Sequence, residues 1–253
     1  AWYATYVEAL KNMSSWAYEL SVEKKFGALE RLILILGFNE YLHQLRGGIL
    51  MSQNEFIRPD ELDINKSFFK ILSSDNIMLF LEIDEIEILK NQFINLVKEH
   101  TSSPTIGNDG LNEDQLIIRE QFFKFSKDKI EPSAHSWHLE DKLIPLEIID
   151  QLAQMGVFGL TIPEIYGGVG LDKISMCVVS EELSRGYIGV GSLATRTDIA
   201  SELILCGGSD AQKEKWLPRI ANGEIIPTAV FTEPNVGSDL GSLQTRAKLV
   251  DDH

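Results

Sequence analysis

The sequence predicts a mainly helical fold that changes to β structure near residue 225. Apolar residues recur at helical spacing through most of the first 224 residues, and glycines stop the helical runs. From residue 225 the apolar spacing changes to the two-residue period of strands. With 253 residues, 44% of them hydrophobic and 24% charged, the chain is long enough for two domains with separate cores.

Residues 1–100 are predicted to form a helical extension. Apolar stripes at helical spacing run through residues 22–46 and 77–98. The first stripe ends at Gly47 and Gly48, and glycine is the residue that most often ends a helix. No apolar run in the sequence reaches the length that a helix needs to span a membrane.

Residues 101–112 are polar and are predicted as a linker. They precede a second helical domain at residues 113–224. Its first helix is capped by Asn112 or Asp114 and closes before Pro132, because proline disfavours a helical residue in front of it. Further helices are predicted over residues 146–155, 173–185 and 191–206, and after a cap at Ser209 or Asp210.

Residues 225–253 are predicted to begin a β domain. Residues 225–231 and 243–250 favour strands, and the second alternates apolar and polar side chains. This β domain has only begun, and the first residue is not Met. We therefore expect the natural chain to extend beyond both ends.

The chain is acidic, with 23 Lys and Arg against 38 Asp and Glu and a formal net charge of −15. A field of this sign repels nucleic acids, and an anionic ligand such as coenzyme A would need local cations or backbone N–H groups. Cys177 and Cys206 lie in apolar helical contexts, without a CxxC pattern or a His/Cys cluster. We therefore expect buried free thiols in a reducing, cytoplasmic compartment, and no metal site.

Residues 232–239, with the sequence TEPNVGSD, form the most specific motif. Gly237 lets the backbone approach a phosphate closely, and Ser238 adds a hydroxyl donor beside it. Phe231 and Thr232 are adjacent on a predicted strand, so they present groups on opposite sides of one pleat. Taken alone, these residues also fit an ordinary turn after a strand.

With its flanking residues, this motif resembles the flavin-contacting signature of the acyl-CoA dehydrogenase family. Further motifs follow the order of that family from residue 113 onward, which favours the flavin site over an ordinary turn. They are EP at 131–132, a helix-preceding proline at 145, GVFG at 156–159, PEIYGGVG at 163–170, SEELSR at 180–185 and KEKWLP at 213–218.

The resemblance implies FAD as the cofactor and α,β-dehydrogenation of an acyl-CoA thioester as the reaction. Transferred by position, Ala229, Phe231 and Thr232 would line the flavin ring, and Gly237 and Ser238 would contact its pyrophosphate. Ser238 would also lie near the CoA end of the substrate. The implied fold is the family's N-terminal all-α domain followed by the first strands of its middle β domain, with the C-terminal helical bundle absent.

The reaction needs a carboxylate base whose pKa is raised by a dry pocket. The family carries this base in its C-terminal helical domain or on a neighbouring helix, so we expect it beyond His253 and expect this chain alone to be inactive. Glu181 and Glu182 fit a helix face better, and Glu233 belongs to the signature as a structural residue. No catalytic residue is assigned within the chain.

Two features narrow the substrate. The extension at residues 1–100 resembles that of the methylsuccinyl-CoA dehydrogenase subfamily, which forms mesaconyl-CoA in the ethylmalonyl-CoA pathway. Ser192 and Arg196 lie on the helix that lines the acyl cavity by resemblance, where a cation would pair with a substrate carboxylate. An Arg196 that pairs with Asp198 or Glu202, or that reaches the surface, is an equally supported alternative.

Other functions stay open. One is a glutaryl- or isovaleryl-type acyl-CoA dehydrogenase with an unrelated extension, and another is a non-catalytic acyl-CoA-binding relative. The resemblance implies electron-transferring flavoprotein as the electron acceptor and a homodimer or homotetramer as the assembly. The extension carries no cluster of His or Cys, so a docking or oligomer-interface role is expected for it.

Overall fold

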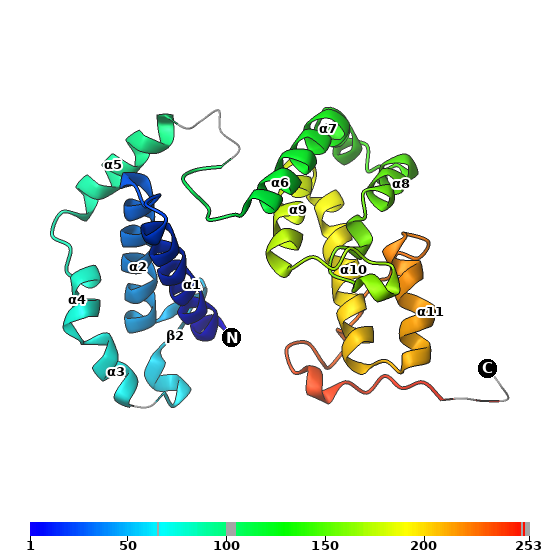
Figure 1. Cartoon of the computed structure of the whole chain (residues 1–253). Helices are drawn as coiled ribbons and strands as arrows, with labels where there is room; N and C mark the ends of the chain where they lie inside the picture. The colour runs from blue at the N-terminus through cyan, green and yellow to red at the C-terminus, as the bar shows by residue number, and fades with distance from the viewer. Residues whose placement is uncertain (65, 100–104, 249, 251–253) are drawn as a thin grey trace. The chain divides into compact units, whose positions relative to one another are not determined.

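The computed structural model describes residues 1–64, 66–99, 105–248 and 250. The chain divides into two compact units, Ala1–Leu111 and Asn112–His253. Each unit is described by itself, and Figure 1 labels the helices of both. No helix among the described residues is long and apolar enough to cross a membrane.

Unit 1 is helical apart from one small hairpin. Its elements are α1 (Trp2–Val22), α2 (Ala28–Gly47), β1 (Ile49–Ser52), β2 (Glu55–Ile57), a 3-10 turn at Pro59–Leu62, α3 (Lys66–Leu72), α4 (Asp75–Leu81) and α5 (Ile86–Glu99). The buried core brings together leucines of four helices: Leu10, Leu42, Leu45, Leu72 and Leu81. Tyr6 and Tyr41 pack beside it with their ring centroids 4.7 Å apart.

The two helices predicted in unit 1 are present but shorter. The helix predicted from residue 22 begins at Ala28, because Lys24 has a positive φ of 59° and interrupts the run. The second prediction, residues 77–98, is divided into α4 and α5 by a non-helical segment at residues 82–85. The apolar stripe therefore crosses a break in the backbone, and none of its α5 residues is buried.

The hairpin of unit 1 was not predicted. β1 and β2 pair antiparallel, with Ile49 opposite Ile57 and Leu50 opposite Phe56. The two strands have only four and three residues. They are too short for the two-residue period of a strand to stand out from the helical pattern around them.

The described end of the predicted linker lies against α1 and α2. Glu30 is buried, and its carboxylate accepts the N–H groups of Gly27 at 3.0 Å and Asn108 at 2.7 Å. Trp16 Nε1 donates to the Asn108 carbonyl at 2.9 Å. Residues 105–111 therefore belong to unit 1.

Unit 2 contains the second helical domain. Its elements are α6 (Glu113–Phe125), a π turn at Ser126–Ile130, α7 (Glu131–Leu139), α8 (Leu146–Gln154), 3-10 turns at Val157–Gly159 and Glu164–Tyr166, α9 (Lys173–Gly186), α10 (Ile188–Gly207), α11 (Asp210–Ala221) and a 3-10 turn at Leu240–Ser242. The predicted caps Asn112 and Ser209 both accept an N–H of the first helical turn. Pro132 does not close the first helix as predicted, because it occupies the first turn of α7, where no N–H is needed.

The first turns of α6 and α9 share one polar link. Asn112 caps α6 by accepting the Gln115 N–H at 2.9 Å, and Asp172 caps α9 by accepting the Ser175 N–H at 2.7 Å. The Gln115 amide then donates to the second Asp172 oxygen at 3.1 Å. One glutamine thus completes both caps.

The core of unit 2 lies around α9 and α10. Leu152, Val179, Leu183 and Val190 are completely buried in it. Gly191 permits the close crossing of the two helices, since a Cβ there would lie 2.8 Å from the Ser184 backbone nitrogen.

Cys177 and Cys206 are free, but the prediction that they are buried is wrong, because both are exposed. The buried face of α9 follows Ser175, Val178 and Val179, and Cys177 lies off that stripe. Apolar neighbours in sequence do not define one helix face.

The segment after α11 contains no assigned strand among the described residues of 225–250. Its only ladder-like pairing there is an isolated bridge between Glu233 and Val236. The fold is mainly helical, as predicted, but residues 225–231 and 243–250 stay without strand partners. A strand needs a neighbour to pair with, and the described chain supplies none for either segment.

Candidate functional site

The exposed face of α10 presents Arg196 to solvent. The Arg196 side chain makes no ion pair or hydrogen bond with any residue that the structure describes. The structure shows the alternative in which Arg196 reaches the surface. It does not pair with Asp198 or Glu202, because residues two and six positions along a helix do not face residue 196. A cation without a protein partner is available to an anionic ligand.

Lys173, rather than Arg196, forms ion pairs with the carboxylates of Asp198 and Glu202. Its Nζ lies 2.8 Å from Asp198 Oδ1 and 2.7 Å from Glu202 Oε1. The hydroxyl of Thr161 also donates to Asp198. Burial lowers the pKa of Lys173, but the hydrogen bonds from its ammonium to the two carboxylates outweigh this effect and raise the pKa overall. This cluster is not apparent from the sequence, because Lys173 lies 25 positions before Asp198 and 29 before Glu202.

Ser192 lies one turn before Arg196 on α10. Its hydroxyl donates to the Gly189 carbonyl at 3.0 Å, so its proton is used within the helix. The oxygen keeps acceptor capacity for a ligand N–H or O–H group. Ser192 can therefore accept a hydrogen bond from a substrate, while Arg196 can only donate.

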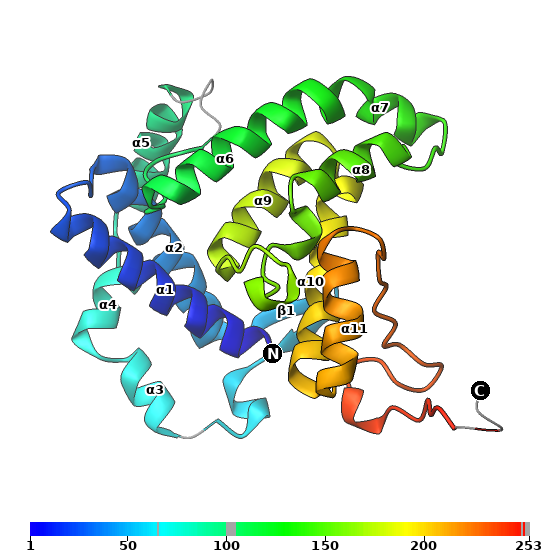
Figure 2. The same ribbon diagram turned by 45° about the vertical axis from the view of Figure 1, so that its right-hand side comes forward.

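Residues 225–245 carry the flavin signature and are called the signature segment, and the first residues of this segment are held in place. The Ile225 N–H donates to the Arg219 carbonyl at 3.0 Å, and Ile226 packs against the core of unit 2. From there the chain runs as an irregular trace toward the turn at Leu240–Ser242 (Figure 2). Ala229 and Phe231 are half-buried, and Thr232 is exposed.

The backbone of residues 228–232 is available for hydrogen bonding. Within the described chain, none of its N–H or C=O groups makes a hydrogen bond. When extended backbone is removed from water, its unused N–H and C=O groups need hydrogen-bond partners. The edge of a flavin ring presents donors and acceptors of the kind that could fill this role.

Glu233 holds the loop that carries the rest of the signature. Its backbone pairs with that of Val236 in a tight turn, and its carboxylate accepts the N–H groups of Gln244 at 3.0 Å and Thr245 at 2.7 Å. The Thr245 hydroxyl donates to the same carboxylate and, with these N–H groups, lowers the pKa of Glu233. This agrees with a structural role for Glu233.

Gly237 and Ser238 are exposed within this loop. Neither backbone N–H donates to a described residue, and a Cβ on Gly237 would meet nothing within 4 Å. Two consecutive free N–H groups and a serine hydroxyl form a suitable donor set for a phosphate. The residues present therefore fit the FAD contacts that the sequence suggests.

Glu181 and Glu182 lie on α9, and their environments differ. Glu182 is completely buried and accepts from Arg185 Nε at 2.8 Å, and its other oxygen lies 3.7 Å from Arg119 Nε. Two guanidinium groups lie beside the Glu182 carboxylate, and neither solvent nor a ligand can reach it. Glu181 is exposed, with its carboxylate 3.9 Å from Arg185. Neither glutamate is suited to act as a base.

The sequence-predicted residues form two groups. Ser192 and Arg196 share α10, whereas Ala229, Phe231, Thr232, Gly237 and Ser238 lie along one loop segment. No hydrogen bond or ion pair joins these groups in the part of the chain that the structure describes. A ligand would have to connect them.

Comparison with known proteins identifies relatives of the chain. Residues 112–224 match the family model described as the acyl-CoA dehydrogenase N-terminal domain. (2S)-Methylsuccinyl-CoA dehydrogenase of Cereibacter sphaeroides is 53% identical over 98% of this chain and 44% of its own length. Mitochondrial isovaleryl-CoA dehydrogenase of Bos taurus is 35% identical over 62% of this chain and 38% of its length.

Among solved structures, glutaryl-CoA dehydrogenase from Mycobacterium smegmatis superposes with a TM-score of 0.51 and 30% identity, covering 56% of this chain and 37% of that one. The chain spans less than half the length of each of these three relatives. The match of the motif-bearing helical region agrees with the resemblance found in the sequence. The chain therefore belongs to the acyl-CoA dehydrogenase family, whose N-terminal helical domain it contains at residues 112–224.

Proposed function

We propose that the protein containing this chain is an FAD-dependent acyl-CoA dehydrogenase that converts (2S)-methylsuccinyl-CoA to mesaconyl-CoA. One observation carries the proposal: the methylsuccinyl-CoA dehydrogenase relative matches 98% of this chain, so it shares the extension as well as the family domain. The isovaleryl-CoA dehydrogenase relative matches only 62% of the chain.

The signature segment supplies the cofactor contacts in this proposal. Ala229, Phe231 and Thr232 hold the flavin ring through their free backbone groups and side chains, and Gly237 and Ser238 hold the pyrophosphate. A flavin held by these residues would supply a hydride acceptor for the β-hydrogen of the substrate. Glu233 keeps the loop closed, so that these donors are positioned before the cofactor arrives.

Arg196 supplies substrate selectivity. Methylsuccinyl-CoA carries a free carboxylate, and a guanidinium pairs with a carboxylate through two parallel hydrogen bonds. Ser192 and Ser238 complete the substrate contacts, Ser192 on the same face of α10 and Ser238 near the CoA end. The free state of Arg196 in this structure supports this role.

The catalytic base is proposed to come from sequence outside this chain, in the helical domain that the family carries after its β domain. Glu182 and Glu233 are both engaged in protein contacts, so neither is proposed as the base. We further propose electron-transferring flavoprotein as the acceptor, a homodimer or homotetramer as the assembly, and the cytoplasm as the location.

Activity of the complete protein tests the proposal. Purified protein should carry FAD, visible in its absorbance spectrum, and should reduce an artificial acceptor with methylsuccinyl-CoA much faster than with glutaryl-CoA or isovaleryl-CoA. A preference for either of the latter would establish a different dehydrogenase. Binding of acyl-CoA without turnover, and without flavin, would establish the non-catalytic relative.

A further inference from the structure

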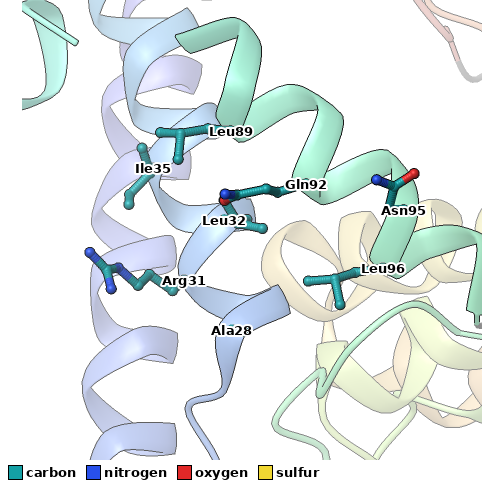
Figure 3. A pocket seen from close by; sticks show the side chains of 8 residues that line it. All are labelled: Ala28, Arg31, Leu32, Ile35, Leu89, Gln92, Asn95 and Leu96. Carbon is teal, nitrogen blue, oxygen red and sulfur yellow. The ribbon is translucent and has the colours of Figure 1, made fainter. Parts of the chain in front are cut away.

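The extension contains a cavity whose lining includes none of the residues proposed above to contact FAD or substrate. It lies between α2 and α5 and encloses about 550 Å³, within the range of about 300–1,000 Å³ typical of small-molecule sites. Both helices belong to unit 1. Its apolar lining consists of Ala28, Leu32, Ile35, Leu89 and Leu96 (Figure 3).

The shape of the cavity suits an extended chain. Its lining on α5 runs from Leu89 to Leu96, seven residues or about 10 Å at 1.5 Å per residue. All of its apolar residues are aliphatic, and no ring is present on which a planar aromatic ligand could stack. A flexible alkyl chain of medium length matches both the length and the lining.

The packing of α5 against α2 leaves the apolar lining of the cavity partly exposed to solvent. α5 has 14 residues, and none of them is buried. Leu89 and Leu96 point toward α2 yet remain half-exposed, as does Ile35 on the opposite side (Figure 3). An alkyl chain between the two helices would remove this surface from water.

Polar side chains at the rim can receive a head group. Arg31, Gln92 and Asn95 line the cavity and are exposed, and their side chains make no hydrogen bond or ion pair with residues the structure describes. The Gln92 amide reaches from α5 toward Leu32 (Figure 3). Arg31 lies in the first turns of α2, and in Figure 3 its guanidinium points away from α5. Its long flexible side chain would turn back toward the cavity to pair with a bound anion.

We infer that the α2–α5 cavity binds a medium-chain carboxylate, with the alkyl chain between Leu32, Leu89 and Leu96 and the carboxylate at Arg31. The neighbouring acid, Glu30, is buried, and its two oxygens accept the N–H groups of Gly27 and Asn108, so it is not the partner of Arg31. The inference does not depend on the proposed dehydrogenase function, since both cavity walls lie in unit 1.

Calorimetric titration of the complete protein with decanoate, below its micelle concentration, tests the inference. We expect saturable 1:1 binding, with pentanoate, decanol and 1-naphthoate each at least tenfold weaker. Leu89→Trp, which fills the cavity, should weaken decanoate binding at least tenfold. Ile88→Trp should not, because Ile88 is 49% exposed and does not line the cavity.

The head group is tested separately. Arg31→Gln should weaken decanoate at least fivefold and leave decanol unchanged, and Arg58→Gln, an exposed cation elsewhere in unit 1, should change neither. Decanoate binding that is absent, or equally reduced by Leu89→Trp and Ile88→Trp, would overturn the inference. So would dissociation of an oligomer by Leu89→Trp without decanoate binding, since the occupant would then be a second copy of the chain.

Discussion

Glu182 and Arg185 form an ion pair whose carboxylate is wholly inside unit 2, with Arg185 Nε 2.8 Å from Glu182 Oε2. Arg119 on α6 approaches the other oxygen of Glu182 at 3.7 Å. The contact of Arg119 with Glu182 thus joins α6 to α9 within the family domain. Buried charges of this kind are stabilising only as a complete set.

Glu182→Gln should destabilise the fold by about 3 kcal/mol, because it leaves two guanidinium groups without their shared carboxylate. Because Arg185 is partly exposed, solvation of its guanidinium offsets part of this destabilisation. Urea unfolding monitored by circular dichroism measures the change. Glu181→Gln, at an exposed position one residue away, should shift the free energy of unfolding by less than about 0.5 kcal/mol. Equal effects of the two substitutions would contradict the prediction.

Arg196→Met should raise KM for methylsuccinyl-CoA in the complete enzyme by about tenfold or more, because the substrate carboxylate loses its charge-assisted hydrogen bonds. KM for isovaleryl-CoA, which has no second carboxylate, should stay the same or fall. Steady-state kinetics with both substrates measure the split. Lys124→Met removes an exposed cation of α6 and should leave both values unchanged. An unchanged KM in Arg196→Met would exclude Arg196 from substrate binding.

Gly191→Ala should destabilise unit 2 by about 1–3 kcal/mol through overpacking against Ser184, more than the helix propensity gained. Gly207→Ala provides the matched control on the same helix, since nothing lies within 4 Å of a Cβ there. It should be neutral or stabilising by less than about 1 kcal/mol. Thermal unfolding of the two variants should give shifts of opposite sign, or a shift in Gly191→Ala alone.

Lowering the pH should break the hydrogen bonds by which Glu233 holds Gln244 and Thr245. Because hydrogen bonds from Thr245 and Gln244 lower the pKa of Glu233 below 4.5, the contribution of this carboxylate is present above pH 4.5 and is lost as pH falls through the lower folded-state value. The amide chemical shifts of Gln244 and Thr245 should therefore titrate with one midpoint below pH 4.5. In Glu233→Gln this transition should disappear, whereas in Glu224→Gln it should persist.

Much of the helical domain could be predicted because its signals are local. Asn112 and Ser209 accept the N–H groups that N-cap residues accept in general, and α8 begins at Leu146, where it was predicted. Pro132 was misassigned because proline both ends helices and begins them, and only the continuation into α7 shows which occurs.

Long-range contacts set the limit of sequence-based prediction. The pairing of Lys173 with Asp198 and Glu202 joins two helices, and the burial of Glu182 depends on Arg119 of a third. A single sequence contains no spacing rule for such contacts. Residues 225–231 carry a strand pattern, yet a pattern of that kind becomes a strand only with a partner beside it.

The glutamine shared by two caps has a consequence for the order of folding. Gln115 and Asp172 are separated by 57 positions, so the link between their helices requires closure of a long loop. α6 can begin on its own cap, but the full set of hydrogen bonds at its start exists only once α9 has reached it. The first turns of these helices are therefore expected to gain protection from hydrogen exchange together, as one cooperative event.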